Sequence, residues 1–269
     1  MRTLALLLCL LVPEALPPDY SIRAVRYATI PQFSLASLIP GAPADQRLDI
    51  AMVVWVIQGD GRTILFDSGF FRQRYIDQFK VTEFIRPDSA LALAGVPAAS
   101  VTDIIVSHAH WDHMGGIDLF PNATIWIQKD EYQYYTGEAW QQGGRRGGID
   151  TADVQSLVRR NTSGKVRLVA GDDVEILPGI RAYTGSRHTY ASQYIRVDGA
   201  QPFVLASDNA YLFRNINNRE ASATFTPADR NGNIAAIDRM IQLAGSPSRV
   251  VPGHDATVFK AGQRVTVIR

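Results

Sequence analysis

Residues 107–116, SHAHWDHMGG, constrain the fold more than any other part of the chain. Three of the five histidines fall within six residues, together with Asp112. Imidazole and carboxylate groups are standard ligands of zinc and similar cations, and a loop can turn them toward one point. The apolar run at 103–107, DIIVS, is typical of a short buried strand. The pattern predicts a strand that ends in a metal-binding loop, with Gly115 and Gly116 allowing a tight turn after it.

The other two histidines also stand at the ends of predicted strands. His188 lies in GSRHT between two such strands, and His254 directly follows the strand predicted at 249–251. Asp208 ends the strand predicted at 203–207. Each of these residues alone has an ordinary explanation, because histidine is often a hydrogen-bonded polar group and aspartate commonly begins turns. Their shared placement favours one site assembled from several strand ends.

Hydrophobic patterns alternate between strands and helices along the chain. The apolar runs at 51–58 and 62–67 flank Gly59-Asp60-Gly61, which predicts a β-hairpin. Helices are expected at 87–95, from a cap at Asp130 to Tyr135, and at 150–160. A later helix should bury the stripe formed by Ile234, Ile237, Ile241 and Ala244. Further strands are expected at 123–128, 167–170, 174–177, 181–184 and 194–197. The simplest packing is two sheets face to face with helices outside.

Length and charge narrow the classes of protein. The chain has 269 residues, of which 46% are hydrophobic, and its formal net charge is +1. This length can bury a large core, and we expect a single domain over residues 19–269. The near-neutral charge argues against a nucleic-acid partner, which usually meets a basic face. A single cysteine, Cys9, excludes an intramolecular disulfide and a cysteine-based zinc site.

The first 18 residues form a separate compositional unit. An unbroken apolar run at 4–12 follows the lone basic residue Arg2. The run is too short to cross a bilayer, which needs ~20 apolar residues, so no stable membrane insertion is expected. It is similar to the core of a secretory signal and precedes a stretch rich in helix breakers. We therefore expect residues 1–18 to be a signal peptide or leader and the protein to be periplasmic or secreted. The alternative is a buried first strand in a cytoplasmic protein.

Taken together, HAHWDH followed by separate His, Asp and His residues at strand ends resembles the metallo-β-lactamase superfamily. The matching motifs run from Asp67 in LFDSG to His254 in PGHD, which is most of the chain. The resemblance implies an αββα sandwich, a mixed α/β (α+β) fold, and two divalent metal ions, with zinc favoured over cobalt, manganese and iron. It implies that one metal is held by His108, His110 and His188, the other by Asp112, His113 and His254, and that Asp208 bridges the two. It also makes Asp67 a supporting residue beside the metal loop rather than a ligand.

Within this superfamily, the segment Asp208-Asn209-Ala210-Tyr211 resembles the N-acyl homoserine lactonases. In that branch a tyrosine three residues after the bridging aspartate points into the site. Residues 185–193 are similar too, although the glycine that usually precedes the third histidine is Arg187 here. Zinc β-lactamases proper use cysteine where Asp208 stands, which argues against that activity.

The predicted function is therefore quorum quenching by lactone hydrolysis. The resemblance implies that a hydroxide held on the metals attacks the ester carbonyl of an N-acyl homoserine lactone. Tyr211 would donate a hydrogen bond to the developing oxyanion, and Asp112 or Asp208 would relay the proton. The expected partner is a small-molecule ester or lactone, and a homodimer is left open.

Other readings share the same ligands. The motif also resembles the phosphotriesterase branch that includes methyl parathion hydrolase, and an exported arylesterase would look similar. Glyoxalase II-like thioesterases would need a basic cluster near the C-terminus, and a nuclease would need a basic groove, neither of which the charge pattern favours. A non-catalytic metal-binding or sensor protein is the alternative from another class. The leaving group that the protein accepts distinguishes these hydrolases: a lactonase releases an alkoxide, whereas the alternatives release a nitrophenolate.

Overall fold

The longest strand, β1 (Ser21–Ser34), begins near the start of residues 18–269, the part of the chain that this computed structural model describes. The sequence patterns do not predict β1. The pairing of β1 with the neighbouring strand shifts register between Arg26 and Ala28. The shift breaks the alternation of buried and exposed residues, which is the sequence pattern that normally indicates a strand. The predicted leader at 1–18 lies outside the described residues, except for Pro18.

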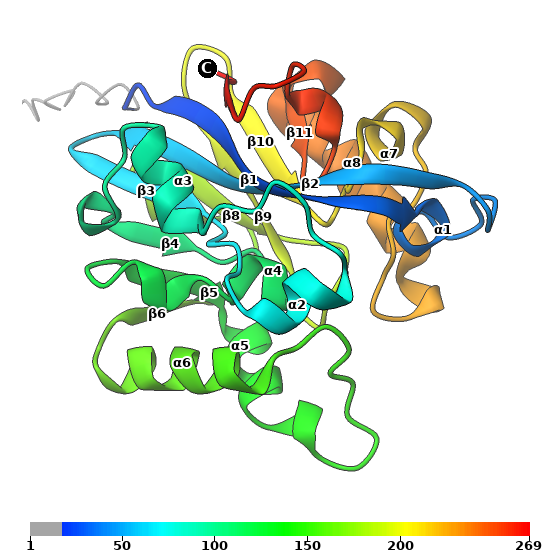
Figure 1. The fold of residues 1–269 in the computed structure, drawn as a ribbon, viewed down its shortest axis with the longest axis horizontal. Coiled ribbons are helices and arrows are strands. Elements are labelled where there is room, and N and C mark those ends of the chain that lie inside the picture. The colour runs from blue at the N-terminus through cyan, green and yellow to red at the C-terminus, as the bar shows by residue number, and fades with distance from the viewer. Residues whose placement is uncertain (1–17) are drawn as a thin grey trace, which may run out of the picture.

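Two sheets carry the fold (Figure 1). The seven-stranded sheet has the order β12-β1-β2-β3-β4-β5-β6, and the five-stranded sheet has the order β11-β10-β9-β8-β7. Besides β1, the first sheet contains β2 (Arg47–Gly59), β3 (Arg62–Phe66), β4 (Asp103–Ile105), β5 (Thr124–Gln128), β6 (Val166–Val169) and β12 (Val265–Val267). The second contains β7 (Val174–Leu177), β8 (Ile180–Thr184), β9 (Gln193–Val197), β10 (Phe203–Ser207) and β11 (Val250–Pro252).

The predicted hairpin joins β2 to β3. The two strands are antiparallel, and Gly59 pairs with Arg62 across a two-residue turn. Asp60 and Gly61 have positive φ angles of 50° and 67°, as the twist of a tight hairpin requires. From β3 onward the strands run parallel through β4 and β5 to β6. This arrangement places β4, which precedes the histidine-rich loop, in the interior of the sheet.

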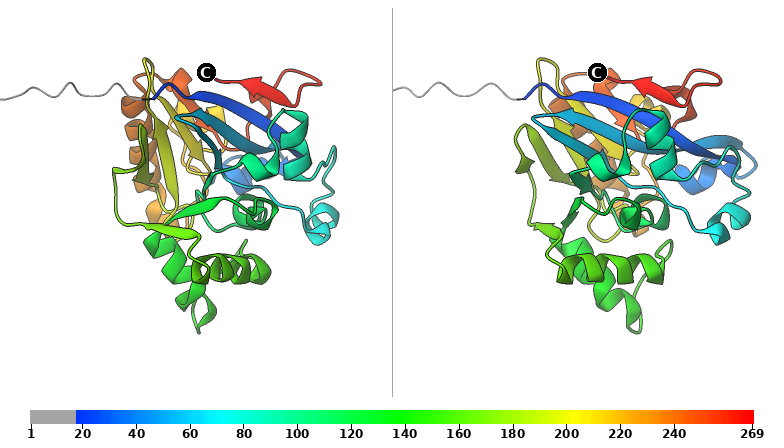
Figure 2. Two further views of the ribbon diagram at one scale, coloured as in Figure 1. Left: turned by 90° about the vertical axis from the view of Figure 1, so that its left-hand side faces the viewer. Right: turned by 60° about the vertical axis from the view of Figure 1, so that its left-hand side comes forward.

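Three apolar clusters separate four layers. The cluster between the sheets contains Trp55, Phe66, Ile195 and Leu205. A second cluster lies between the seven-stranded sheet and its helices, and a third lies between the five-stranded sheet and α8 (Arg230–Ala244). Figure 2 shows α8 on the outer side of the five-stranded sheet and the helices of the first half on the other side. The predicted αββα sandwich is confirmed.

The remaining α-helices are α1 (Leu35–Leu38), α2 (Gln73–Gln78), α3 (Pro87–Leu93), α4 (Trp111–Met114), α5 (Lys129–Thr136), α6 (Thr151–Thr162) and α7 (Phe213–Asn218). Asp150 caps α6 by accepting the Ala152 N–H. The predicted cap at Asp130 is wrong, because α5 begins directly at the end of β5 and its N-cap is Gln128.

The predicted core stripe of α8 is confirmed for Ile237 and Ala244, whereas Asn233 and Met240 are buried in place of Ile234 and Ile241. Asn233 is buried because its amide donates to the backbone oxygen of Asn209, so a polar contact rotates the buried face. Over residues 18–269, no helix has both the length and the apolar character needed to cross a membrane.

Candidate metal centre

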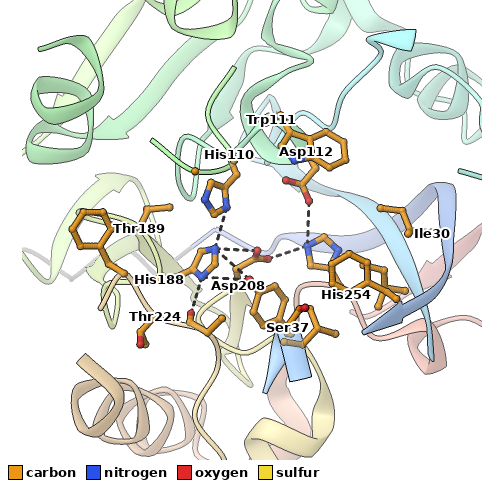
Figure 3. A pocket seen from close by; sticks show the side chains of 18 of the residues that line it. Ile30, Ser37, His110, Trp111, Asp112, His188, Thr189, Asp208, Thr224 and His254 are labelled. Carbon is orange, nitrogen blue, oxygen red and sulfur yellow. Dashed lines mark hydrogen bonds and ion pairs between the residues drawn. The ribbon is translucent and has the colours of Figure 1, made fainter. Parts of the chain in front are cut away.

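The predicted site residues converge where strands of both sheets end (Figure 3). His108 and His110 follow β4, while Asp112 and His113 lie on the short helix α4 that begins after His110. His188 lies in the turn between β8 and β9. Asp208 follows β10 and His254 follows β11. Because β10 and β11 are parallel, their C-terminal ends meet at the same edge.

These residues form two groups of potential ligands. The three-histidine group consists of His108, His110, His188 and Asp208, and the second group of Asp112, His113 and His254. Within each group the ligand atoms all lie within 4.8 Å of one another. Imidazole and carboxylate donors at this spacing are the set that zinc and related divalent cations take.

Hydrogen bonds fix the histidine rings. Nδ1 of His188 lies 2.8 Å from the backbone oxygen of Ala223, and Nδ1 of His254 lies 2.9 Å from the backbone oxygen of Ala51. A carbonyl oxygen only accepts, so both Nδ1 atoms carry the proton. Each Nε2 therefore presents a lone pair to the site, which is the tautomer that metal-binding histidines usually adopt.

The spacing of three ring nitrogens fits one cation. His110 Nδ1 lies 3.0 Å from His108 Nε2 and 3.1 Å from His188 Nε2. A tetrahedral ion with nitrogen ligands at 2.0–2.1 Å places those nitrogens about 3.3 Å apart. Converging lone pairs at this distance repel each other unless a cation lies between them. The three-histidine group therefore fits a divalent metal.

Asp208 connects the two groups. Its Oδ2 lies 3.3 Å from His188 Nε2, while its Oδ1 lies 3.0 Å from His254 Nε2. Oδ1 is buried and has no hydrogen-bond partner among the described residues. A buried, unpartnered carboxylate oxygen is costly in a protein interior. A bridging role, with one oxygen toward each metal, accounts for this atom.

The protonation states of the three-histidine group suit metal binding, because the pKa of each of its histidines is lowered. Burial, reinforced by the charge of His113, holds the pKa of His108 well below its usual 6.5. Burial and His188 lower the pKa of His110 to about 3. Burial alone would raise the pKa of Asp208, but His113 and His254 outweigh it and hold that pKa well below 3.8. Neutral imidazoles and an ionised carboxylate are the ligand forms that cations bind.

Asp67 supports the site without belonging to either group of ligands. Its carboxylate accepts the backbone N–H of Ser107 at 2.8 Å and the hydroxyl groups of Ser107 and Ser207 at 2.9 and 3.0 Å. Sequence reasoning missed both serines. Each is the last residue before a ligand residue, His108 or Asp208, and that adjacency was the available signal.

Tyr211 lies against the three-histidine group. Its hydroxyl is 3.4 Å from both ring nitrogens of His188, and the side chain is buried. Burial, together with the charges of Asp208 and Asp112, raises the pKa of Tyr211 well above 10. The phenol therefore keeps its proton and can donate a hydrogen bond into the site.

A cavity of about 520 Å³ opens onto both groups. Asp112, Asp208 and Tyr211 are among the residues that line it. The apolar part of its wall includes Ile30, Phe33, Leu38, Ile50, Met52, Phe79, Trp111, Ala223 and Phe225. Trp111 stacks on Tyr75 and Phe79, with ring centroids 4.0 and 5.0 Å apart, so it both lines the cavity and packs on α2.

Arg187, which stands where a glycine was expected, adopts a conformation that favours glycine. Its φ is 55°, in the left-handed region. Its guanidinium lies over the rings of Tyr190 and Phe225, each at 5.3 Å from the ring centroid. These cation–π contacts help to hold the strained backbone beside His188.

Comparison with known proteins agrees with this geometry. The family model described as the metallo-beta-lactamase superfamily matches residues 52–254. An N-acyl homoserine lactonase from a Bacillus species is 25% identical over 236 residues, covering 82% of this chain and 86% of that protein. The N-acyl homoserine lactonase AttM of Agrobacterium fabrum is 44% identical over 167 residues, 60% of each chain.

A solved structure of a quorum-quenching N-acyl homoserine lactone lactonase has the same fold. It superimposes with a TM-score of 0.73 at 19% identity, covering 90% of this chain and 95% of that one. The predicted resemblance to the lactonase branch is confirmed by these relatives. Because the family model spans most of the chain and includes every candidate ligand, the chain belongs to the metallo-β-lactamase superfamily.

Proposed function

We propose that the protein is a metal-dependent hydrolase that opens the lactone ring of N-acyl homoserine lactones. The observation that carries the proposal is the position of Asp208 between two ligand groups that line a cavity with a large apolar wall. A paired cation site stabilises charge on an ester carbonyl, and the apolar wall suits an acyl chain. The N-acyl homoserine lactonases among its relatives support this choice of substrate.

We expect the apolar wall of the cavity to bind the acyl chain of the lactone. Ile30 and Phe33 come from β1, Ile50 and Met52 from β2, and Leu38 from α1. Burying each methylene of an acyl chain is worth about 0.8 kcal/mol. We therefore expect long-chain lactones to bind more tightly than short-chain ones, until the chain reaches the end of the wall.

Each group in the site has a separate role in the proposed hydrolysis. Two divalent cations, when bound, supply a nucleophilic water of lowered pKa and positive charge for the oxyanion. Tyr211, which keeps its proton, donates a hydrogen bond to the carbonyl oxygen as its negative charge grows. Asp112 and Asp208 line the cavity, and either carboxylate can take the proton from the attacking water and pass it to the leaving alkoxide.

Zinc is the metal we propose for both positions. Five histidines and two aspartates provide borderline nitrogen and hard oxygen donors, which suit zinc better than calcium or magnesium. Metal content measured on protein purified without added metal tests this assignment.

The direct test is hydrolysis of a long-chain acyl homoserine lactone, followed by acid release. Metal-replete protein should open the ring, and the same protein stripped with a chelator should not. Restoring zinc should restore the rate. Metal-replete protein that binds two ions but leaves every lactone intact would overturn the proposed substrate and leave the metal centre standing.

A second substrate class is favoured by one observation. Phe33, Phe79 and Trp111 give the cavity aromatic surfaces that would also accept an aryl leaving group. An aryl ester or a phosphotriester, as for methyl parathion hydrolase, is therefore the alternative. Parallel assays with a nitrophenyl ester and a nitrophenyl phosphotriester decide between them, because the preferred substrate has the higher kcat/KM.

Export of the protein is also a proposal. The apolar run at 4–12 and the breakers after it support a cleaved leader and a periplasmic or secreted enzyme. N-terminal sequencing of the protein recovered from its native cells tests it. A mature chain that begins near residue 18 supports export, and one that begins at Met1 contradicts it.

A further inference from the structure

Glu131 is a fully buried carboxylate outside the two groups of ligands. It lies in the first turn of α5, directly after β5, and its side chain has 0% exposure. Over residues 18–269, no lysine, arginine or histidine forms an ion pair with it. Burying a carboxylate without a cation is costly, so neutral donors must satisfy its oxygens.

Three hydrogen bonds satisfy the Glu131 carboxylate, and they come from two loops. Oε1 accepts the backbone N–H of Ala109 at 2.9 Å and the hydroxyl of Thr189 at 2.6 Å. Oε2 accepts the backbone N–H of Ala191 at 2.6 Å. Burial raises the pKa of the Glu131 carboxyl to about 7, and the three hydrogen bonds act against that rise by favouring the ionised form. Glu131 therefore ties the two loops together.

Both loops carry ligands of the same group. Ala109 lies between His108 and His110, which follow a strand of the seven-stranded sheet. Thr189 directly follows His188, which lies between two strands of the five-stranded sheet. The three-histidine group thus spans two sheets. The 3.1 Å distance between His188 Nε2 and His110 Nδ1 crosses from one loop to the other, so it depends on how the two loops are held.

We propose that Glu131 is a positioning residue that fixes the loop of His108 and His110 against the loop of His188 and so sets the metal affinity of the three-histidine group. This inference rests on the proposed function only in requiring a metal there. A side chain that filled space alone could be apolar and would avoid the cost of burying a charge. The carboxylate is used because two acceptor oxygens can hold three donors from separate loops.

The Glu131→Gln variant tests this role with little change of shape. The amide has only one acceptor oxygen, so its NH₂ group must face either Ala191 N–H or the donors of Ala109 and Thr189. Donor then faces donor, and the loops must separate. We expect the affinity for one of the two metals to fall 10–100-fold, as for other groups that orient metal ligands.

Asp103→Asn is the matched control. Asp103 is also a buried carboxylate, and it accepts from Arg62 Nη1 at 3.0 Å and Trp126 Nε1 at 2.9 Å. It begins β4, at the end of that strand opposite to His108. Its substitution removes buried carboxylate hydrogen bonds without touching either ligand loop, so it measures the effect of lost stability alone.

The readout is metal content after dialysis against increasing chelator, with thermal unfolding of each metal-free protein measured alongside. We expect a range of chelator concentrations in which wild type and Asp103→Asn each keep two zinc ions, whereas Glu131→Gln keeps only one. Identical curves for wild type and Glu131→Gln would overturn the proposal, as would an equal shift in Asp103→Asn. Because the readout is metal content, a wild type that binds two ions without opening lactones refutes the substrate and not the role of Glu131.

Thr189→Val keeps the test decisive if Glu131→Gln does not fold. This variant removes one of the three donors and preserves the shape of the side chain. We expect a smaller loss of metal affinity in the same direction. A Thr189→Val curve that coincides with wild type, in the absence of a folded Glu131→Gln protein, counts against the proposal.

Discussion

Asp67 Oδ2 lies 2.8 Å from Nδ1 of His113, although the two residues are 46 positions apart in the chain. The contact gives His113 the same orientation that backbone carbonyls give His188 and His254: Nδ1 is held, and Nε2 faces the site. A carboxylate in this position also increases the basicity of the ring. The supporting role predicted for Asp67 therefore has a direct structural basis.

Asp67→Asn should weaken the second group of ligands, because the amide cannot accept from both serines and His113 at once. Asparagine tolerates the positive φ of 63° at this position, so the backbone should hold. We expect metal affinity to fall 10–100-fold, measured by chelator titration. Asp60→Asn, at the exposed hairpin turn with φ 50°, is the control and should leave the titration unchanged. An unaltered Asp67→Asn titration would remove Asp67 from the site.

Asp208→Ala should abolish turnover and reduce metal occupancy. Asp208 places one carboxylate oxygen near His188 and the other near His254. The substitution therefore removes the negatively charged ligand that both metals would share. Metal analysis and lactone hydrolysis check this together. A variant that keeps both metals and the normal rate would contradict the two-metal assignment.

Tyr211→Phe should lower kcat on the order of 10²-fold, because one donor to the developing oxyanion is lost. Metal content should not change, since the phenol is not among the ligand groups. Steady-state kinetics on a lactone, paired with metal analysis, measures both effects. If kcat stays at the wild-type value, Tyr211 only lines the cavity.

Substitutions of Arg187 separate backbone strain from side-chain contacts. Arg187→Ala keeps the unfavourable φ of 55° and loses the contacts with Tyr190 and Phe225. Arg187→Gly loses the same contacts and relieves the strain. We therefore expect the glycine variant to be more stable than the alanine variant by about 1 kcal/mol, measured by denaturant unfolding. The opposite order would show that the left-handed conformation is not strained.

Metal-free protein should lose stability in acid through His110. Burial and His188 lower the pKa of this residue to about 3, whereas in the unfolded chain it titrates near 6.5. Below pH 6.5 the unfolded state gains a proton that the folded state does not, so the free energy of unfolding falls by up to about 1.4 kcal/mol per pH unit. His110→Asn should show a smaller slope, because the contribution of His110 is lost while that of His108, whose pKa is also lowered, remains. Urea unfolding of both metal-free proteins between pH 5 and 7.5 measures the difference, and parallel curves would contradict it.

Local patterns predicted much of what surrounds the site. The DIIVS run and the HAHWDH segment identify β4 and its loop, because a short apolar run and a cluster of ligand-type residues are both visible in neighbouring positions. The glycines at 59 and 61 identify the hairpin of β2 and β3, because a tight turn between two apolar runs is also visible in neighbouring positions. The positions of Asp208 and His254 near strand ends favour a shared site, and the resemblance to the superfamily implies their roles as ligands.

Only the tertiary structure decided how these pieces act together. The bulged strand β1, which supplies part of the cavity wall, lacks a regular alternation, so no local pattern reveals it. Glu131 reads as an ordinary acidic residue at the start of a helix, and the carbonyl oxygens of Ala51 and Ala223 leave no sign in the sequence at all. The sequence by itself determined which side chains can bind metal, because that depends on residue type. The fold decided which nitrogen faces the site and what holds it there, because those contacts join residues that are far apart in the chain.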